Sequence, residues 1–321
     1  MNIGIIMAGG TGSRMAGAQA ATQTGAQAAS QAGAQGDLPK QFLDLGGKPI
    51  IMHSLNTFLE SGCFDAIYIG MHPDWVEYMG DLISGEKAGA KSAPTADSEP
   101  NTPGADSKPN LPVNGLHIIS GGADRNATLL NVLDAIESDL RDMATSDTAH
   151  ISEYAEDASP YAYGTDPIIV THDAARPFVT TEMIEKSIEA ARQVGAATVA
   201  IPATDTIAVA GAAPENDEEA SADAPSATGA LSATCANSNK TLISEIPDRK
   251  NLFNIQTPQS FRLSAFREAY SELTTEQSKN LTDVSGVFVA AGKPVAIVQG
   301  DPSNIKITTS LDLKVAETVL L

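Results

Sequence analysis

The chain opens with Met1-Asn-Ile-Gly-Ile-Ile-Met-Ala-Gly-Gly-Thr-Gly-Ser-Arg14, and this stretch decides the fold class. The apolar run from Ile3 to Met7 predicts a buried strand. The glycines that follow allow a sharp turn and a close approach of a ligand to the backbone, whose N–H groups can bind phosphate oxygens. Arg14 adds a forked donor with a permanent charge. We therefore expect a nucleotide site at the end of the first strand of an α/β sheet.

Two common nucleotide-binding motifs do not match this loop. A dinucleotide-binding loop needs G-x-G-x-x-G and an acidic residue about 20 positions later, but Gly10-Thr-Gly12 is followed by Ser-Arg-Met and no strand ending in Asp or Glu lies there. The G-K-[ST] of a P-loop is absent as well. A glycine-rich turn alone is weak evidence, since many are simple tight connections. The nucleotide interpretation gains weight from Leu38-Pro-Lys-Gln-Phe42 and Gly46-Gly-Lys-Pro-Ile50, which follow it.

Composition narrows the class of protein. The 321 residues carry a net charge of −20 and the sequence pI is about 4.5, which argues against a nucleic-acid-binding surface. The two cysteines, Cys63 and Cys235, suggest no disulfide framework and fit a reducing compartment. No signal peptide and no run of about 18 apolar residues is present, so we expect a cytoplasmic protein that does not contact a membrane.

Four segments have compositions foreign to a packed core: 17–37, 85–115, 142–166 and 211–240. They are rich in Ala, Gln, Gly, Ser, Pro or acidic residues and hold more than half of the net negative charge. Such segments cannot bury enough apolar area to offset their ordering entropy, so we expect mobile loops. The first could instead be a partly helical Ala/Gln segment.

The remaining sequence alternates between strand and helix patterns. This alternation predicts a single α/β domain over 1–321, with a doubly wound and mostly parallel sheet whose ligands gather at the carboxyl ends of the strands. The expected strands are 2–7, 66–70, 116–120, 167–171, 197–202, 207–209, 242–245, 253–256 and 295–299, and the expected helices are 50–60, 75–83, 125–140, 181–194, 264–273, 282–290 and 310–320.

Two further motifs fit phosphate binding. Lys40 could close over a triphosphate together with Arg14, although an isolated lysine is usually a solvated surface residue. Gly121-Gly-Ala-Asp-Arg-Asn-Ala-Thr128 follows a strand and opens a helix, whose N-terminus favours anions. It could equally be a strand-to-helix turn in which Asp124 is the cap and Thr128 caps or packs.

Thr171-His-Asp-Ala-Ala-Arg-Pro177 is the strongest local signal after the N-terminus. Asp173 follows an apolar strand, and a carboxylate there can hold Mg²⁺ that bridges phosphate oxygens. We expect His172 to orient or pack rather than to bind the metal. A catalytic His-Asp pair is the poorer interpretation, because no serine or cysteine nucleophile motif accompanies it. Arg176 fits a phosphate-binding fork, with a structural salt bridge as the alternative.

Three later groups place a hydroxyl or a cation beside apolar strand residues. They are Thr204-Asp-Thr206, Pro247-Asp-Arg249 and Asn304-Ile-Lys-Ile-Thr308. Lys306 stands out because a lysine inside an apolar run usually needs a partner.

Together these motifs resemble the cytidylyltransferases that activate five-carbon polyol phosphates, over roughly 220 residues outside the four segments, a normal single-domain size. The resemblance rests on Met7-Ala-Gly-Gly-Thr-Gly-Ser-Arg14, Pro39-Lys-Gln41, Gly121-Gly-Ala-Asp-Arg125, His172-Asp-Ala-Ala-Arg-Pro177, Asp205-Thr-Ile207, Gln256-Thr-Pro-Gln-Ser-Phe261 and Asn304-Ile-Lys-Ile-Thr308. It implies a Rossmann-like nucleotidyltransferase fold with a protruding β-arm over about 207–246 that forms a homodimer. Part of the substrate site would then come from the second subunit.

The resemblance also implies roles for individual residues. The nucleotide would be bound by Met7, Ala8, Gly9, Gly10, Gly12, Gly122 and Thr128. The triphosphate and the reacting phosphates would contact Arg14, Lys40 and Lys306, with Asp173 facing Mg²⁺. The polyol phosphate would be bound by Arg176, Thr206 and Arg249.

Two branches of the family are candidates, acting on ribitol 5-phosphate or on 2-C-methyl-D-erythritol 4-phosphate. Side features such as His72-Pro-Asp-Trp75 and Leu281-Thr-Asp283 resemble the ribitol branch, and Ala123 departs from the acidic residue associated with the methylerythritol branch. We therefore expect CMP transfer from CTP to D-ribitol 5-phosphate with release of pyrophosphate, and 2-C-methyl-D-erythritol 4-phosphate is the alternative acceptor. A module that binds CTP without turning it over, and uridylyl or guanylyl transfer to a sugar phosphate, are the alternatives.

Overall fold

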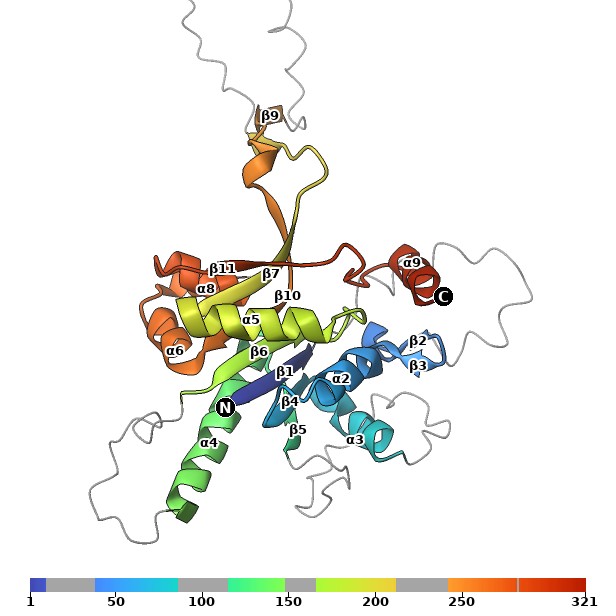
Figure 1. Cartoon of the computed structure of the whole chain (residues 1–321), viewed down its shortest axis with the longest axis vertical. Coiled ribbons are helices and arrows are strands. Elements are labelled where there is room, and N and C mark those ends of the chain that lie inside the picture. The colour runs from blue at the N-terminus through green and yellow to red at the C-terminus, as the bar shows by residue number, and fades with distance from the viewer. Residues whose placement is uncertain (10–37, 86–114, 148–165, 212–241, 282) are drawn as a thin grey trace, which may run out of the picture. The chain divides into compact units, whose positions relative to one another are not determined.

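The computed structural model describes residues 1–9, 38–85, 115–147, 166–211, 242–281 and 283–321. The predicted contacts of Gly10, Gly12 and Arg14 therefore lie outside the described residues. The chain divides into two compact units, one of 1–200 with 255–321 and one of 201–254. Figure 1 labels the helices and strands.

The larger unit is built on a seven-stranded sheet in the order β11-β7-β10-β6-β1-β4-β5. Its strands are β1 (Asn2–Ala8), β4 (Ala66–Met71), β5 (Leu116–Ser120), β6 (Ile168–Asp173), β7 (Ala196–Pro202), β10 (Phe253–Arg262) and β11 (Ala296–Gln299). The first strand lies near the centre and pairs in parallel with β4 and β6. β10 pairs with β6 in the antiparallel direction, so the sheet is mixed.

Helices cover both faces of this sheet (Figure 1). One face packs against α2 (Ile50–Glu60), α3 (Val76–Ser84) and α5 (Thr181–Val194). The other packs against α4 (Arg125–Asp147), α6 (Leu263–Ser271) and α8 (Val284–Ala290). Alternate residues of β1 serve the two faces: Ile6 and Ala8 join the first cluster, whereas Ile3, Ile5 and Met7 join the second. The expected doubly wound, mostly parallel α/β fold is confirmed.

A third, smaller apolar cluster supports the C-terminal part of the chain. The short strands β2 (Asp44–Leu45) and β3 (Lys48–Pro49) form a hairpin, and α9 (Ser310–Leu320) packs beside it. Leu45, Ile307 and Ala316 are fully buried there. Burial of Ile307 anchors the segment that carries Lys306, which is important for the site.

The smaller unit contains the strands β8 (Val209–Gly211) and β9 (Leu242–Glu245), which pair in the antiparallel direction. A 3₁₀ turn, Arg249–Asn251, follows, and the backbone N–H of Ala203 donates to the carbonyl of Leu252 at 2.9 Å. Several apolar side chains of this unit are exposed. Among the described residues of both units, no helix is long and apolar enough to cross a membrane.

Several details of the expected elements were wrong. β10 continues past Gln256 to Arg262, because its buried residues complete the pairing with β6. α4 runs to Asp147, into the segment expected to be a loop, since no Pro or Gly interrupts it there. Residues 304–308, which were expected to include strand residues around Lys306, form no strand. A short helix, α7 (Thr275–Asn280), was not expected at all, and its capping box of Thr274 and Gln277 explains its start.

Candidate active site

Four parallel strands end side by side at one edge of the sheet. Their last residues are Ala8, Met71, Ser120 and Asp173. In the register of the ladders, Met7 lies beside Asp173 and Ala8 lies beside Met71. The predicted nucleotide loop and the predicted metal ligand therefore lie at neighbouring strand ends, as the carboxyl edge of a parallel sheet requires.

The carboxylate of Asp173 is the centre of a cluster of positive charges. Arg125 Nη1 donates a hydrogen bond to its Oδ1. Lys306 Nζ lies 2.8 Å from Oδ2, and Arg176 Nε lies 3.8 Å from the same oxygen. The predicted need of Lys306 for a partner is thus met by Asp173, and three residues far apart in the sequence meet on one buried carboxylate.

The electrostatics of this cluster favour a bound anion. Burial alone would raise the pKa of the Asp173 carboxyl, but Arg125 and Lys306 outweigh it and hold this pKa well below its usual value. Burial lowers the pKa of Arg176, which Asp173 partly offsets, and a guanidinium remains charged at neutral pH. Three cations therefore face a single anion, and the excess positive charge can neutralise phosphate groups.

Arg176 is fixed by the backbone around it. Its Nη1 donates to the carbonyl of Asn304 at 2.8 Å and its Nη2 to the carbonyl of Ile255 at 3.4 Å. Its Nε is buried and makes no hydrogen bond. The guanidinium thus joins the Asp173 turn to the segment that carries Lys306, which agrees with the structural alternative for Arg176 and leaves phosphate binding as a prediction.

His172 lies behind the site and is fully buried. Burial lowers the pKa of its imidazole to about 4, so the ring is neutral at pH 7. Its ring nitrogens contact the Thr257 hydroxyl and the Arg176 carbonyl. The expectation that His172 orients or packs is confirmed.

Thr128 organises the glycine-rich turn before α4. Its hydroxyl donates to the carbonyl of Asp124 at 2.7 Å and accepts from the N–H of Gly122 at 3.1 Å. A Cβ at Gly9 would lie 3.1 Å from Thr128 Oγ1, and one at Gly121 would lie 2.8 Å from it. The side chain is buried, so Thr128 shapes the turn from below, and its predicted contact with the nucleoside stays a prediction.

Asp124 is the cap of this turn, as the structural alternative stated. Its Oδ1 accepts a hydrogen bond from the backbone N–H of Ala127 at 2.8 Å. Gly122 has no room for a side chain, because a Cβ there would lie 2.5 Å from the Cβ of Ala127. The two strand-end loops thus meet at Thr128, with Gly9 on one side and Gly121 on the other.

Lys40 is held near the end of β1 by its neighbour in the chain. It begins the 3₁₀ turn Lys40–Phe42. The buried side chain of Gln41 donates from Nε2 to the carbonyl of Ala8 at 2.9 Å. The Pro-Lys-Gln segment is therefore tied directly to the nucleotide loop, although the triphosphate role of Lys40 stays a prediction.

Thr206 and Arg249 belong to the smaller unit. Arg249 Nη1 donates to the carbonyl of Thr204 at 2.9 Å, so the two predicted groups approach each other within this unit. Their binding of a polyol phosphate stays a prediction.

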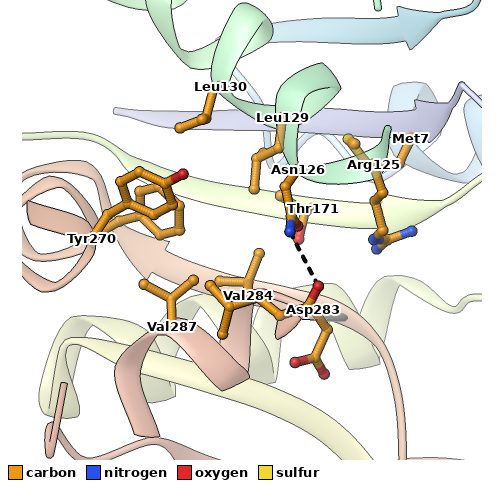
Figure 2. Close-up of a pocket in the computed structure, with 12 residues that line it drawn as sticks. Met7, Arg125, Asn126, Leu129, Leu130, Thr171, Tyr270, Asp283, Val284 and Val287 are labelled. Atoms are coloured by element: carbon orange, nitrogen blue, oxygen red, sulfur yellow. Dashed lines mark hydrogen bonds between the residues drawn. The ribbon is translucent and has the colours of Figure 1, made fainter. Parts of the chain in front are cut away.

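Arg125 was not predicted to be a site residue. It is the first residue of α4, where the helix dipole disfavours a positive charge. An arginine at this unfavourable position was a signal that its side chain binds an anion. In Figure 2 Arg125 and Asn126 lie on the same turn, and Asn126 Nδ2 donates to the carbonyl of Leu281 at 3.1 Å. This bond joins the start of α4 to the chain before α8 and so steadies the turn that bears Arg125.

Asp173 fits the role of one protein ligand of a metal ion. Within the described residues no three His, Cys, Asp or Glu side chains gather as a ready-made site. Asp173 supplies one carboxylate, and Mg²⁺ is commonly held by one or two carboxylates, waters and substrate phosphates. Each oxygen of Asp173 accepts from one cation and keeps a lone pair.

Comparison with known proteins agrees with this geometry. A family model described as IspD, 2-C-methyl-D-erythritol 4-phosphate cytidylyltransferase, matches residues 26–152, 161–218 and 215–321. The chain belongs to this cytidylyltransferase family. It is also 30% identical over 317 residues to a ribitol-5-phosphate cytidylyltransferase of Streptococcus pneumoniae serotype 2, covering 98% of this chain and 97% of that protein.

Solved structures of the cytidylyltransferase family share the fold. A 4-diphosphocytidyl-2C-methyl-D-erythritol synthase from Anaerococcus prevotii aligns with a TM-score of 0.57 at 20% identity, over 100% of this chain and 98% of that one. A 2-C-methyl-D-erythritol 4-phosphate cytidylyltransferase from Thermus thermophilus aligns with a TM-score of 0.52 at 22% identity, over 99% and 98%. The suspected family and the nucleotidyltransferase fold are confirmed, and the protein is a nucleotidyltransferase of the cytidylyl class.

Proposed function

We propose that the protein transfers CMP from CTP to D-ribitol 5-phosphate, giving CDP-ribitol and pyrophosphate. The observation that carries this proposal is the convergence of Arg125, Arg176 and Lys306 on Asp173 at the strand edge beside the β1 loop. The choice of ribitol 5-phosphate is supported by the full-length similarity to enzymes named for that substrate.

The reaction proceeds by displacement at the α-phosphorus of CTP. A phosphate oxygen of the polyol phosphate forms the new P–O bond, and the bond from the α-phosphorus to the bridging oxygen of the β-phosphate breaks. The electron pair leaves with pyrophosphate. No general base is required, because a phosphate monoester with a second pKa of about 6 is mostly dianionic at neutral pH.

The protein contributes positioning and charge neutralisation. The loop of β1 and the turn at Gly122 bind the nucleotide, while Lys40, Arg14 and Lys306 contact its phosphates. Arg125 contacts Asp173, as Lys306 does, and neutralises charge on the same phosphates. Mg²⁺, with Asp173 as its protein ligand, supplies further positive charge at the phosphate oxygens when bound.

The smaller unit supports the proposal of a homodimer. Its exposed apolar side chains include Ile207, Val209, Ile243 and Ile246, which are between 40% and 66% exposed. Apolar side chains exposed in this number favour burial against a second copy, which would bring Thr206 and Arg249 to the polyol phosphate. Light scattering on the purified protein tests the dimer, and a monomer at micromolar concentration would refute it. We place the protein in the cytoplasm.

Transfer to 2-C-methyl-D-erythritol 4-phosphate is the second candidate, favoured by the name of the matching family model. Pyrophosphate release measured with CTP and each polyol phosphate separates the two. We expect kcat/KM to be at least tenfold higher with ribitol 5-phosphate, and the reverse order would refute that substrate. CTP binding without pyrophosphate release from either would instead identify a non-catalytic module, and a competition among the four nucleotides tests the base.

A further inference from the structure

A chain of three hydrogen bonds, two buried and one partly buried, runs behind Asp173. The backbone N–H of Asp173 donates to Thr257 Oγ1 at 3.1 Å. Thr257 Oγ1 lies 2.9 Å from His172 Nδ1, and His172 Nε2 lies 3.0 Å from the carbonyl oxygen of Arg176. Thr257 is on β10 and the other three residues are on β6 or its following turn, so the chain joins the two antiparallel strands.

The groups at the two ends of this chain of hydrogen bonds determine which atom is the donor in each bond. A carbonyl oxygen only accepts, so His172 Nε2 must carry the imidazole proton and donate to Arg176. Nδ1 is then the acceptor of the ring, and the Thr257 hydroxyl donates to it. The lone pairs of that hydroxyl remain for the N–H of Asp173. In this order every donor has an acceptor.

Thr257 also reaches the segment that bears Lys306. Its carbonyl accepts from Asn304 Nδ2 at 2.9 Å, and the carbonyl of Asn304 accepts from Arg176 Nη1 at 2.8 Å. One residue of β10 is therefore bonded through its side chain to the Asp173 turn and through its backbone to the neighbourhood of Lys306.

We infer that His172 and Thr257 are positioning residues that fix Asp173 and Arg176 relative to Lys306 for cytidylyl transfer. The inference rests on the proposed function of the same site. Neither side chain reaches the substrates, since His172 is 0% and Thr257 4% exposed. They act through the backbone: the chain holds the N–H of Asp173 and the carbonyl of Arg176 in place, and these residues carry a carboxylate and a cation of the cluster.

A purely structural role would predict something different. Removal of a buried hydroxyl leaves its hydrogen-bonding partner unsatisfied, which costs about 1–3 kcal/mol of stability wherever the hydroxyl lies. Thr171 provides the matched case, because it is equally buried, lies two residues before Asp173 on β6, and donates to the carbonyl of Gln259 at 3.2 Å. Its hydroxyl takes no part in the chain.

The test compares Thr257→Val, Thr257→Ser and Thr171→Val in the full-length protein. Val removes the hydroxyl at nearly constant volume, whereas Ser keeps it. Loss of an outer hydrogen-bonding partner typically costs 10- to 100-fold in activity, so we expect kcat of Thr257→Val to fall by about that factor. Thr257→Ser should stay within about threefold and Thr171→Val within about twofold of the wild type, although both Val variants lose a similar amount of thermal stability.

Two results would overturn the inference: a Thr257→Val enzyme with wild-type kcat, or an equal loss of kcat in Thr171→Val. A second measurement does not depend on turnover. Nitrogen NMR of ¹⁵N-labelled histidine should show His172 as the Nε2–H tautomer in the wild type and in Thr257→Ser, with a shifted Nδ1 signal in Thr257→Val. An Nδ1–H tautomer in the wild type would refute the chain itself.

The wild type is assayed first. Absence of pyrophosphate release from it would reject the proposed function, while the NMR result would still decide whether the hydrogen-bonded chain exists as described.

Discussion

Replacing Arg125 by Gln tests the charge cluster most directly. Arg125 is bonded to Asp173 Oδ1 and starts α4, whereas Lys306 and Arg176 approach Oδ2. Gln is nearly as long, favours helix, and can donate one hydrogen bond to the carboxylate without a positive charge. The change therefore removes a charge from the site while Asp173 keeps two cations.

The structure determines how much stability and how much turnover Arg125→Gln should lose. Exposed ion pairs are worth about 0–1 kcal/mol and removal of one partner of a fully buried pair costs about 3–5 kcal/mol. The Arg125 side chain is 34% exposed and that of Asp173 is 7% exposed. Because Asp173 keeps Lys306 and Arg176 as partners, we expect the free energy of unfolding to fall by about 1–2 kcal/mol at pH 7. The turnover number should fall by about 10²-fold, because removal of one donor that neutralises developing charge typically lowers kcat by about 10²–10³-fold.

The assay is pyrophosphate release with saturating CTP and ribitol 5-phosphate, paired with urea unfolding. Arg141→Gln is the matched control: Arg141 is on the same helix, its side chain is 57% exposed, and it faces Glu137 at 3.8 Å. We expect this control to keep its turnover and to change in stability by less than about 0.5 kcal/mol. An Arg125→Gln enzyme within twofold of the wild-type rate would show that the charge of Arg125 takes no part in the reaction.

Three further predictions follow from the same site. Lys306→Ala should lower kcat about 10²-fold or more with the fold kept, and a near-normal rate would remove Lys306 from the mechanism. Gly121→Ala should weaken CTP binding at least tenfold by calorimetry, because the new Cβ would lie 2.8 Å from Thr128 Oγ1 and 3.0 Å from the carbonyl oxygen of Met71. In the control Gly80→Ala the new Cβ has no atom within 4 Å, so this variant should bind CTP normally and its free energy of unfolding should rise by about 0.5–1 kcal/mol. The cations hold the Asp173 pKa below its unfolded value of about 3.9, so its stabilising contribution is complete above about pH 5 and is lost progressively as pH falls below that. Because Asp173 titrates alike in both unfolded chains, the difference in unfolding free energy between wild type and Arg125→Gln should be constant above about pH 5 and should narrow only as pH falls through the folded-state pKa of Asp173 in the variant; a difference that never narrows in acid would contradict the ion-pair origin.

Most of the fold followed from local sequence patterns. The strand 116–120 and the helices 50–60, 181–194 and 310–320 have the expected bounds, because each has a clear period and clear flanking residues. β10 could not be delimited in this way: Gln256 to Ser260 are polar or proline, yet all are buried by pairing with β6 and by the packing around it. Tertiary contacts decide such a strand, and one sequence does not contain them.

The site also has features that local sequence patterns predict and features that only tertiary contacts determine. Asp173 was predictable because it follows an apolar strand, and Lys306 because a lysine in an apolar run requires a partner. Their direct contact was not predictable from spacing, since the two residues are 133 positions apart and the chain between them had to fold first. Thr257 and Gln41 stand in motifs that carry the family resemblance, but no role was predicted for either, because each acts through a hydrogen bond to a residue remote in sequence.

The charge arrangement also limits the chemistry of the site. A general base near neutral pH needs a pKa close to the working pH, but the cations around Asp173 hold its pKa far below that range, and burial holds the pKa of His172 at about 4 with both nitrogens engaged. Asp173 is consequently a permanent anion whose partners are cations. A nucleophile that enters this site must bring its own negative charge, which a phosphate monoester does and a hydroxyl does not. A polyol lacking its phosphate should therefore give no CMP transfer even at high concentration, whereas transfer to such a polyol would demand a base that the described part of the site does not provide.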